Sequence, residues 1–178
     1  MKTVKIKDKN FSIFISSDKI QKSINDIAQK INNDVKGKTP LFVVVLNGAF
    51  MFAAELLKKI NINCEISFVK FSSYKKTKSS LNVKKLIGLN ENIKGRTLII
   101  VEDIVDSGIT MDNFINDIKK YEPEDIKIAT LLYKPKAFTK NFKVDYVGIE
   151  IPNDFVVGYG LDYDGLGRNL TDIYKIIE

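Results

Sequence analysis

Residues 98–110 read Leu98-Ile99-Ile100-Val101-Glu102-Asp103-Ile104-Val105-Asp106-Ser107-Gly108-Ile109-Thr110. Four apolar residues, typical of a buried strand, run directly into two adjacent carboxylates. A third carboxylate, Asp106, precedes a turn of small residues, and a helical pattern follows. Such a turn presents backbone N–H groups at a helix N-terminus, where the helix dipole also favours an anion. Since adjacent carboxylates suit a diol or a hydrated magnesium ion, the stretch predicts a site for a phosphorylated sugar.

Three acids within five positions also have a purely structural interpretation, the solvated end of a strand. Glu102 and Asp103, however, continue a core strand directly, and they would repel each other unless a cation or hydroxyl groups engaged them. A second candidate site lies at Asn47-Gly48, where the glycine allows a ligand to approach the backbone closely. Taken alone, that glycine is more simply explained by an ordinary turn.

Apolar strand patterns alternate with helical patterns on both sides of residues 98–110. We expect helices from about Asp18 to Gly37, over Phe50–Ile60, and from Met111 to Pro123. Strands are expected over residues 40–46, 65–71, 97–101, 126–133 and 144–151, whereas residues 72–85 are too polar for a regular element and residues 4–15 alternate with a period of two. This alternation predicts an α/β fold with a doubly wound parallel sheet, in which ligands bind beyond the carboxyl ends of the strands.

Composition limits the chemistry. The chain has 178 residues, 44% of them hydrophobic, which is the length of one domain with a proper core. It contains no histidine and a single cysteine, Cys64, which excludes zinc sites of the usual Cys/His kind, disulfides within the chain and histidine-dependent nucleophilic catalysis. Any general base must therefore be a carboxylate, a lysine or a tyrosine.

Net charge and the absence of targeting signals in the sequence bear on localisation and on the kind of binding partner. Residues 1–6 alternate charged and apolar side chains, and no apolar stretch approaches the ~20 residues of a membrane helix, so we expect a cytoplasmic protein. The net charge of +6 suggests an acidic partner without naming one. Six lysines and no acid lie between Glu65 and Glu91, where a solvated basic loop and a phosphate-attracting loop are equally open interpretations.

Residues 101–110 resemble the phosphoribosyl-pyrophosphate motif of the type I phosphoribosyltransferases, two acids followed by a D-[ST]-G-x-T loop. Further segments resemble the hypoxanthine-guanine branch of that family, in the same order along the chain: 46–49 its pyrophosphate loop, Ser73-Tyr74 its mobile catalytic loop, 143–148, 151–152 and 155–163 its purine-binding segment, and 168–170 a segment near its C-terminus. The resemblance implies a single domain over residues 1–178, with a mainly parallel sheet and a small hood formed by terminal segments.

The function implied by this resemblance is purine salvage. A magnesium-dependent enzyme would transfer the phosphoribosyl group of phosphoribosyl pyrophosphate to hypoxanthine, with guanine as a second base, giving IMP or GMP and pyrophosphate. The resemblance also implies a homo-oligomer, a dimer or tetramer, with small-molecule substrates and neither nucleic acid nor membrane as a partner. Two alternatives remain open. One is specificity for xanthine or a pyrimidine, and the other is a nucleotide-sensing regulator that binds nucleic acid on the same fold.

The resemblance implies catalytic roles for three residues. Asp106 would be the general base at the purine N7, and Ser73 and Tyr74 would cover the pyrophosphate when their loop closes. Magnesium would be held by Glu102, Asp103 and Asp162, the first two also binding the ribose hydroxyls.

The remaining implied contacts are with substrate. They involve Asn47, Gly48, Ser107, Gly108, Ile109, Thr110, Lys143, Phe155, Val156 and Arg168. Lys143 would donate to the purine O6, Phe155 would stack on the ring, and Val156 would offer backbone groups to the base edge. Arg168 would meet the pyrophosphate. Ile109 departs from the pattern, since many relatives carry lysine there, and it removes a charge near the phosphate.

Overall fold

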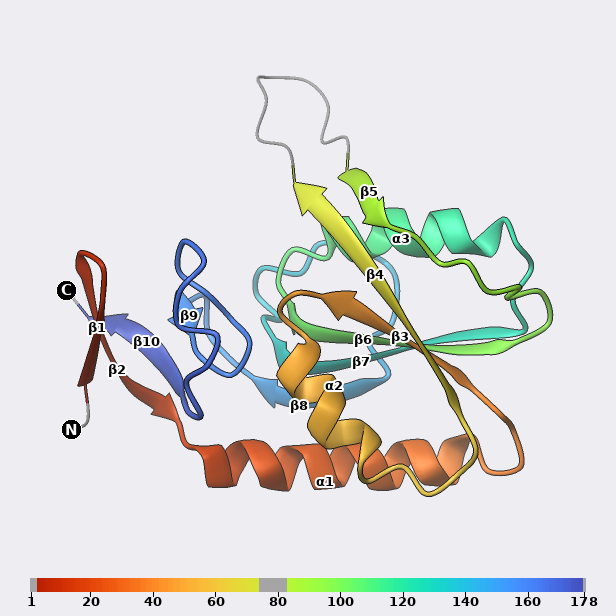
Figure 1. Cartoon of the computed structure of the whole chain (residues 1–178), viewed down its shortest axis with the longest axis horizontal. Helices are drawn as coiled ribbons and strands as arrows, with labels where there is room; N and C mark the ends of the chain where they lie inside the picture. Colours follow the sequence, from red (N-terminus) through yellow and green to blue (C-terminus); the bar gives the residue numbers. More distant parts are fainter. Residues whose placement is uncertain (1–2, 74–82, 178) are drawn as a thin grey trace.

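A six-stranded sheet forms the centre of the computed structural model, which describes residues 3–73 and 83–177 (Figure 1). Its strands, in spatial order, are β5 (Val83–Ile87), β4 (Glu65–Ser73), β3 (Leu41–Leu46), β6 (Thr97–Val105), β7 (Asp125–Tyr133) and β8 (Tyr146–Glu150). All neighbouring pairs from β4 to β8 are parallel, and only β5 runs antiparallel to its neighbour. The predicted parallel sheet is confirmed.

Helices cover both faces of this sheet, which explains the continuous apolar strands. On β3, Phe42 and Val44 pack into one core with α1 (Ser17–Asp34) and α2 (Phe50–Leu57). The alternate β3 residues Leu41, Val43 and Val45 pack into a second core with α3 (Ile109–Lys119) on the opposite face. Because side chains alternate along a strand, a strand buried on both faces must be apolar at every position.

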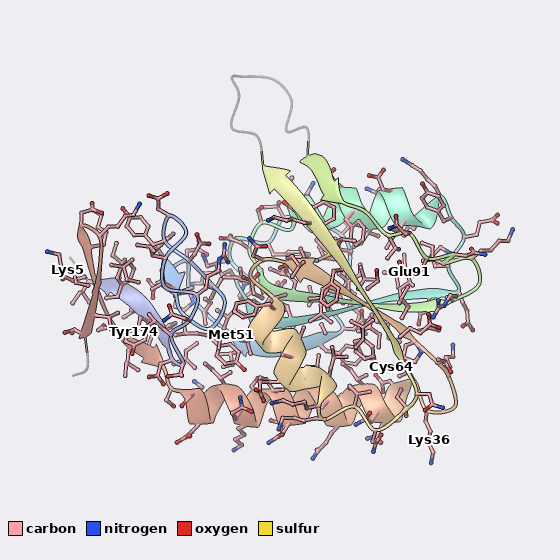
Figure 2. All side chains as sticks on the ribbon, in the orientation of Figure 1. Lys5, Lys36, Met51, Cys64, Glu91 and Tyr174 are labelled. Atoms are coloured by element: carbon pink, nitrogen blue, oxygen red, sulfur yellow. The ribbon has the colours of Figure 1, made fainter. Side chains whose placement is uncertain are left out.

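A smaller antiparallel sheet is built from both ends of the chain. Its order is β1 (Thr3–Ile6), β2 (Lys9–Ile15), β10 (Ile173–Ile177) and β9 (Val156–Val157). Phe11, Val157 and Tyr174, the last labelled in Figure 2, form a core of their own there. In Figure 1 the arrowheads of β3 and β8 point toward this sheet. The predicted hood of terminal segments is therefore confirmed, and it lies beyond the carboxyl ends of the parallel strands.

Residues 72–85 differ from the prediction of no regular element. β4 continues to Ser73, and β5 begins at Val83, which pairs with Ser73. The main chain of β4 provides the pairing, so a short edge strand forms despite Lys84 and Lys85; lysines are common on such edges. Tyr74 lies outside the described residues.

The ends of several elements also differ from expectation; α3, for example, ends at Lys119 instead of Pro123. β6 continues four residues beyond Val101 to Val105, which places Glu102 and Asp103 within the strand rather than after it. α2 ends at Leu57 instead of Ile60. Within residues 3–73 and 83–177, no helix combines the length and apolarity needed to cross a membrane.

Candidate active site

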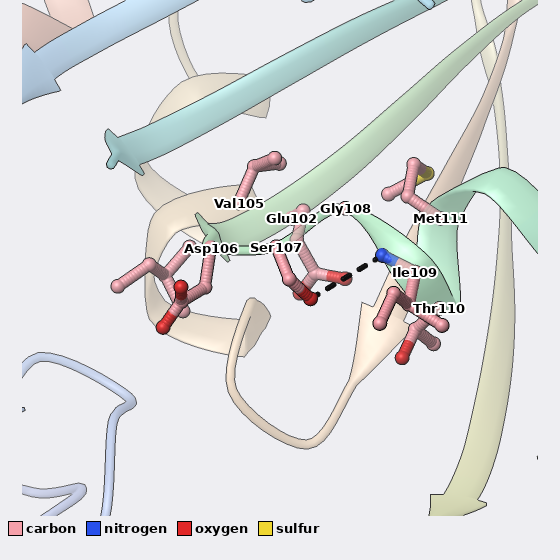
Figure 3. Close-up of a pocket in the computed structure, with 9 residues that line it drawn as sticks. Glu102, Val105, Asp106, Ser107, Gly108, Ile109, Thr110 and Met111 are labelled. Carbon is pink, nitrogen blue, oxygen red and sulfur yellow. Dashed lines mark hydrogen bonds between the residues drawn. The ribbon is translucent and has the colours of Figure 1, made fainter. Parts of the chain in front are cut away.

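The turn between β6 and α3 encloses a cavity of about 200 Å³ (Figure 3). It is lined by Glu102, Ile104, Val105, Asp106, Ser107, Gly108, Ile109, Thr110 and Met111. Gly108 caps the helix with a φ of +80°, in the left-handed region that favours glycine. A Cβ atom there would also lie 2.7 Å from the ring of Phe138, so the turn accepts no side chain at this point.

The first turn of α3 makes this cavity suitable for an anion. The helix begins at Ile109, whose N–H donates to Ser107 Oγ at 3.5 Å (Figure 3). The first N–H groups of a helix have no partner within it, and the dipole adds partial positive charge there. Ser107 and Thr110 bring hydroxyl groups to the same cavity. The predicted phosphate-binding residues Ser107, Gly108, Ile109 and Thr110 are thus brought together.

Glu102 and Asp103 are neighbours on β6, and their carboxyl groups lie close enough for a hydrogen bond between the two side chains. Glu102 lines the cavity. Asp103 is buried and lies against the loop that follows β3, since a Cβ atom on Gly48 would be 1.7 Å from Asp103 Oδ2. Burial raises the pKa of both carboxyl groups, and the charge of Asp103 raises the pKa of Glu102 further. The acid pair therefore favours a bound cation or hydroxyl donors.

Asp106 pairs with a lysine that the sequence analysis missed. Lys134 Nζ lies 2.9 Å from Asp106 Oδ2, and the lysine side chain is 11% exposed against 53% for the aspartate. Lys134 directly follows β7, and its N–H donates to the carbonyl of Val105 at 3.0 Å. A lysine immediately after a buried apolar strand is the signal that could have identified it, because β7 ends at the same edge of the sheet as β6.

Lys143 does not lie with this group. It precedes the start of β8 by three residues, its side chain is 81% exposed, and its ammonium lies 3.3 Å from Asp145 Oδ1. Because β8 runs parallel to β7, its first residues lie toward the amino ends of the strands, away from Asp106. The expectation that Lys143 reaches the substrate is corrected by this position.

The Asn47-Gly48 loop is held between the sheet and the segment that leads into the hood. Asp103 lies against one side of Gly48, and Gly160 lies against its carbonyl group. A Cβ atom on Gly160 would be 2.0 Å from the carbonyl oxygen of Gly48. Arg168 Nη1 donates to the carbonyl of Gly160 at 2.6 Å, and its Nη2 lies 2.6 Å from Asp162 Oδ1. The predicted residues Asn47, Gly48, Asp162 and Arg168 therefore form one cluster, in which Asp162 and Arg168 bind each other.

Val156 begins β9, the outer strand of the hood sheet, and Phe155 immediately precedes it. Phe155 is 46% exposed, and its ring centroid lies 5.9 Å from that of Tyr163. Its carbonyl accepts from Ile176 N–H on β10. Since backbone groups alternate in direction along an antiparallel strand, those of Val156 point away from β10, toward the free edge of the described sheet. For Ser73 the structure gives the backbone alone.

The carboxylates of Glu102 and Asp103 fit a magnesium ion whose remaining ligands come from the substrate and water. Over the described residues, no group of three or more histidine, cysteine, aspartate or glutamate side chains is arranged to hold a metal. Mg²⁺ commonly binds through one or two carboxylates together with substrate phosphates and water. Glu102 and Asp103, whose pKa values are raised, match that sparse requirement.

A doubly wound parallel sheet, an acid pair at its edge, an anion-binding helix N-terminus and a hood above them define the type I phosphoribosyltransferase class. Residues 16–164 match the phosphoribosyl transferase domain family, and the chain belongs to that family.

The relatives of this chain include hypoxanthine-guanine phosphoribosyltransferases. It is 40% identical over 162 residues to that of Bacillus subtilis, with 90% of each chain covered. Identity to that of Mycobacterium tuberculosis is 38% over 169 residues, 91% of this chain and 84% of the relative. The chain is also 40% identical over 162 residues to the bifunctional protein TilS/HprT of Listeria monocytogenes, and the match covers 90% of this chain but only 25% of that longer protein.

Solved structures agree with the sequence relatives. The hypoxanthine-guanine phosphoribosyltransferase of Bacillus anthracis superposes with a TM-score of 0.86 at 35% identity, covering 94% of this chain and 97% of that chain. The hypoxanthine phosphoribosyl transferase of Trypanosoma cruzi gives a TM-score of 0.88 at 33% identity, covering 98% and 95%. The latter structure concerns the role of that enzyme's C-terminal region in its oligomeric state and activity.

Proposed function

We propose that this chain transfers the phosphoribosyl group of phosphoribosyl pyrophosphate to hypoxanthine, and to guanine as a second base, in purine salvage. The products are IMP or GMP and pyrophosphate. The observation that carries the proposal is the Asp106–Lys134 pair, 2.9 Å apart, at the rim of a cavity built on a helix N-terminus. A proton acceptor and a cation are thus held together beside a phosphate-binding turn.

The ribose 5′-phosphate occupies the cavity, where it accepts from the backbone N–H groups and hydroxyls of residues 107–110. Displacement at the anomeric carbon passes through an oxocarbenium-like state, as in glycoside hydrolysis. Negative charge then develops on the leaving pyrophosphate. Arg168 and the backbone of Asn47-Gly48 stabilise that charge once the guanidinium exchanges Asp162 for phosphate oxygens.

Asp106 and Lys134 recognise the base between them. Asp106 holds or removes the proton at the purine N7, and a carboxylate is the natural base in a chain without histidine. Lys134, 2.9 Å from that carboxylate, donates to the O6 atom next to N7. Lys134 therefore takes the role that the family resemblance assigned to Lys143. Phe155 stacks on the ring, and the free backbone groups of Val156 pair with the base edge.

This arrangement favours 6-oxopurines over adenine. An ammonium group can only donate, so it pairs with a carbonyl oxygen and not with the amino group of adenine. A buried donor left without a partner discriminates strongly between such substrates. Hypoxanthine and guanine share the O6 acceptor and are both accepted.

Glu102 and Asp103 would hold a magnesium ion together with the substrate, and the ion would supply neutralisation of charge on the leaving pyrophosphate. Asp162 would join them once Arg168 exchanges it for the phosphate oxygens.

The chain also assembles into a homo-oligomer, a dimer or tetramer. Support comes from exposed apolar side chains on one side of the sheet. Ile66 and Phe68 on β4 are each 46% exposed and pair in register with Phe42 and Val44, which face α1 and α2. Phe50 on α2 is 44% exposed. Monomeric proteins rarely leave a large apolar surface of this kind uncovered.

Parallel assays of five bases test the function. The wild-type chain is given phosphoribosyl pyrophosphate and Mg²⁺ with hypoxanthine, guanine, xanthine, adenine or uracil, and nucleotide formation is followed by absorbance. Turnover with hypoxanthine and guanine is expected, and none with adenine or uracil. Turnover only with xanthine or uracil would reassign the base. Negligible turnover with every base, combined with salt-sensitive RNA binding, would identify the regulator instead.

A further inference from the structure

Lys140 packs on the phosphate-binding turn without a part in the reaction described above. It lies in the connection from β7 to β8, and its stem contacts the turn so closely that a Cβ atom on Gly108 would be 3.1 Å from Lys140 Cγ. Its ammonium lies 3.2 Å from Asp112 Oδ2, in the first turn of α3. Both side chains are about one-third exposed, at 29% and 31%.

The charges around the cavity make this ion pair significant. Among the described residues that line the cavity are two carboxylates, Glu102 and Asp106, but no lysine or arginine. Asp112 adds another carboxylate in the first turn of the same helix. Lys134 is already paired with Asp106 at the other end of the turn. A doubly charged phosphate entering this site therefore meets mostly negative side chains, and Lys140 is the cation positioned to offset Asp112.

We propose that Lys140 is a positioning residue for the ribose 5′-phosphate: it neutralises Asp112 and packs against the turn at Gly108. This inference rests on the proposed function, because it assumes that the cavity takes the phosphate of phosphoribosyl pyrophosphate. The charge of Lys140 acts mainly on the affinity for phosphoribosyl pyrophosphate, since the 5′-phosphate does not change during transfer at the anomeric carbon. The effect belongs in the KM for phosphoribosyl pyrophosphate and not in kcat.

Lys140→Met separates the charge from the packing, because methionine keeps an unbranched apolar stem. The KM for phosphoribosyl pyrophosphate is expected to rise about two- to fivefold, the range typical of a charge in the terminal turn of a helix, with kcat unchanged. Lys140→Arg should retain most of the wild-type affinity. The difference between Lys140→Met and wild type should shrink as salt increases, because the groups are partly exposed.

Asp112→Asn tests the partner. It should lower the KM, and adding it to Lys140→Met should recover affinity close to that of wild type, because the charge that Lys140 offsets is then gone. Lys127→Met is the matched control. Lys127 forms a similar pair with Asp125 at 3.3 Å and is 24% exposed, but it lies at the start of β7, on the far edge of the sheet. Its kinetics should remain those of wild type.

Calorimetric binding of ribose 5-phosphate is measured on the same variants. An unchanged affinity and KM for Lys140→Met at low salt would overturn the inference, as would an equal KM for Lys140→Arg and Lys140→Met. Loss of kcat with unchanged KM would also contradict it. If the wild-type chain binds ribose 5-phosphate but forms no nucleotide, the proposed function fails while the binding data still decide the role of Lys140.

Discussion

Burial raises the pKa of Glu102, and the neighbouring carboxylate of Asp103 raises it further. A carboxyl group whose pKa is raised in the folded chain holds its proton more tightly there than in the unfolded chain. Its contribution to stability is therefore greatest below its ordinary pKa of 4.5 and is lost as the pH rises through the raised value. Above that raised value, the ionised carboxylate opposes folding.

Glu102→Gln is predicted to be more stable than wild type at neutral pH and to lose most of its activity. The amide keeps the size of the side chain but removes the buried charge, so the gain should grow as the pH rises from 4.5 through the raised pKa of Glu102. Denaturant unfolding across this range, without substrate or Mg²⁺, measures it. A variant that is less stable than wild type at pH 8 would show that the ionised carboxylate is satisfied within the free protein.

Lys134→Met is predicted to raise the KM for hypoxanthine about 10- to 100-fold, the usual effect of losing a hydrogen bond from a charged donor. Its KM for phosphoribosyl pyrophosphate should change much less. Lys143→Met provides the matched comparison and should behave as wild type, since this side chain is 81% exposed and lies away from Asp106. The opposite ranking in steady-state kinetics would return the base-binding role to Lys143.

Lys134 and Lys143 show which site residues can be predicted from the sequence and which cannot. The acids and the turn of residues 102–110 were predictable because carboxylates that continue an apolar strand and precede a helix are unusual. The choice between Lys134 and Lys143 depends on which end of a parallel strand faces the site. One follows β7 and the other precedes β8, so strand direction distinguishes them.

At the scale of elements, apolar runs predicted the strands well where both faces are buried. β3 and most of β7 were identified on this basis. The pattern failed where polar residues occupy strand positions for other reasons. β6 carries its carboxylates inside the strand, and β5 is held by main-chain pairing with β4 at the edge of the sheet. Neither β5 nor residues 102–105 of β6 are visible as a continuous apolar run.

The loop after β3 packs closely against the segment between β9 and β10 at Gly160. Gly160→Ala is predicted to destabilise the fold by about 2–4 kcal/mol and to abolish activity, because the new Cβ would lie 2.0 Å from the Gly48 carbonyl oxygen. Gly165→Ala is the control, since Gly165 also has a positive φ, of +83°, but no described atom lies within 4 Å of its added Cβ.

Gly165→Ala should therefore cost about 1 kcal/mol, the strain of the backbone alone. Thermal unfolding and kcat/KM measured together distinguish the two variants. Equal losses of stability in both would mean that backbone conformation, and not contact between Gly160 and the Asn47-Gly48 loop, explains the requirement for glycine.

At the scale of the whole molecule, the two sheets are tied together beside the site. Asp172, just before β10, accepts from the N–H of Ser17 at the start of α1 at 2.8 Å. The Gly48–Gly160 contact makes a second connection. The hood therefore sits in a defined place over the carboxyl ends of the strands, which brings Phe155 and Arg168 into the proposed site.

Phe68→Asp is predicted to dissociate the homo-oligomer into monomers, because it places a charge in the exposed apolar surface on β4. Light scattering coupled to size-exclusion chromatography gives the mass directly. Tyr121→Asp, at a 64% exposed aromatic residue beyond the end of α3, is the control and should leave the mass unchanged. A monomeric wild-type chain would refute the assembly.

Product stoichiometry of the wild-type chain distinguishes transfer to the base from simple hydrolysis. Phosphoribosyl pyrophosphate, hypoxanthine and Mg²⁺ are incubated with the protein, and IMP and pyrophosphate are quantified by chromatography. Equal amounts of IMP and pyrophosphate are expected, with no reaction when hypoxanthine is omitted. Pyrophosphate and ribose 5-phosphate released without IMP, or no pyrophosphate released despite binding, would contradict transfer to the base.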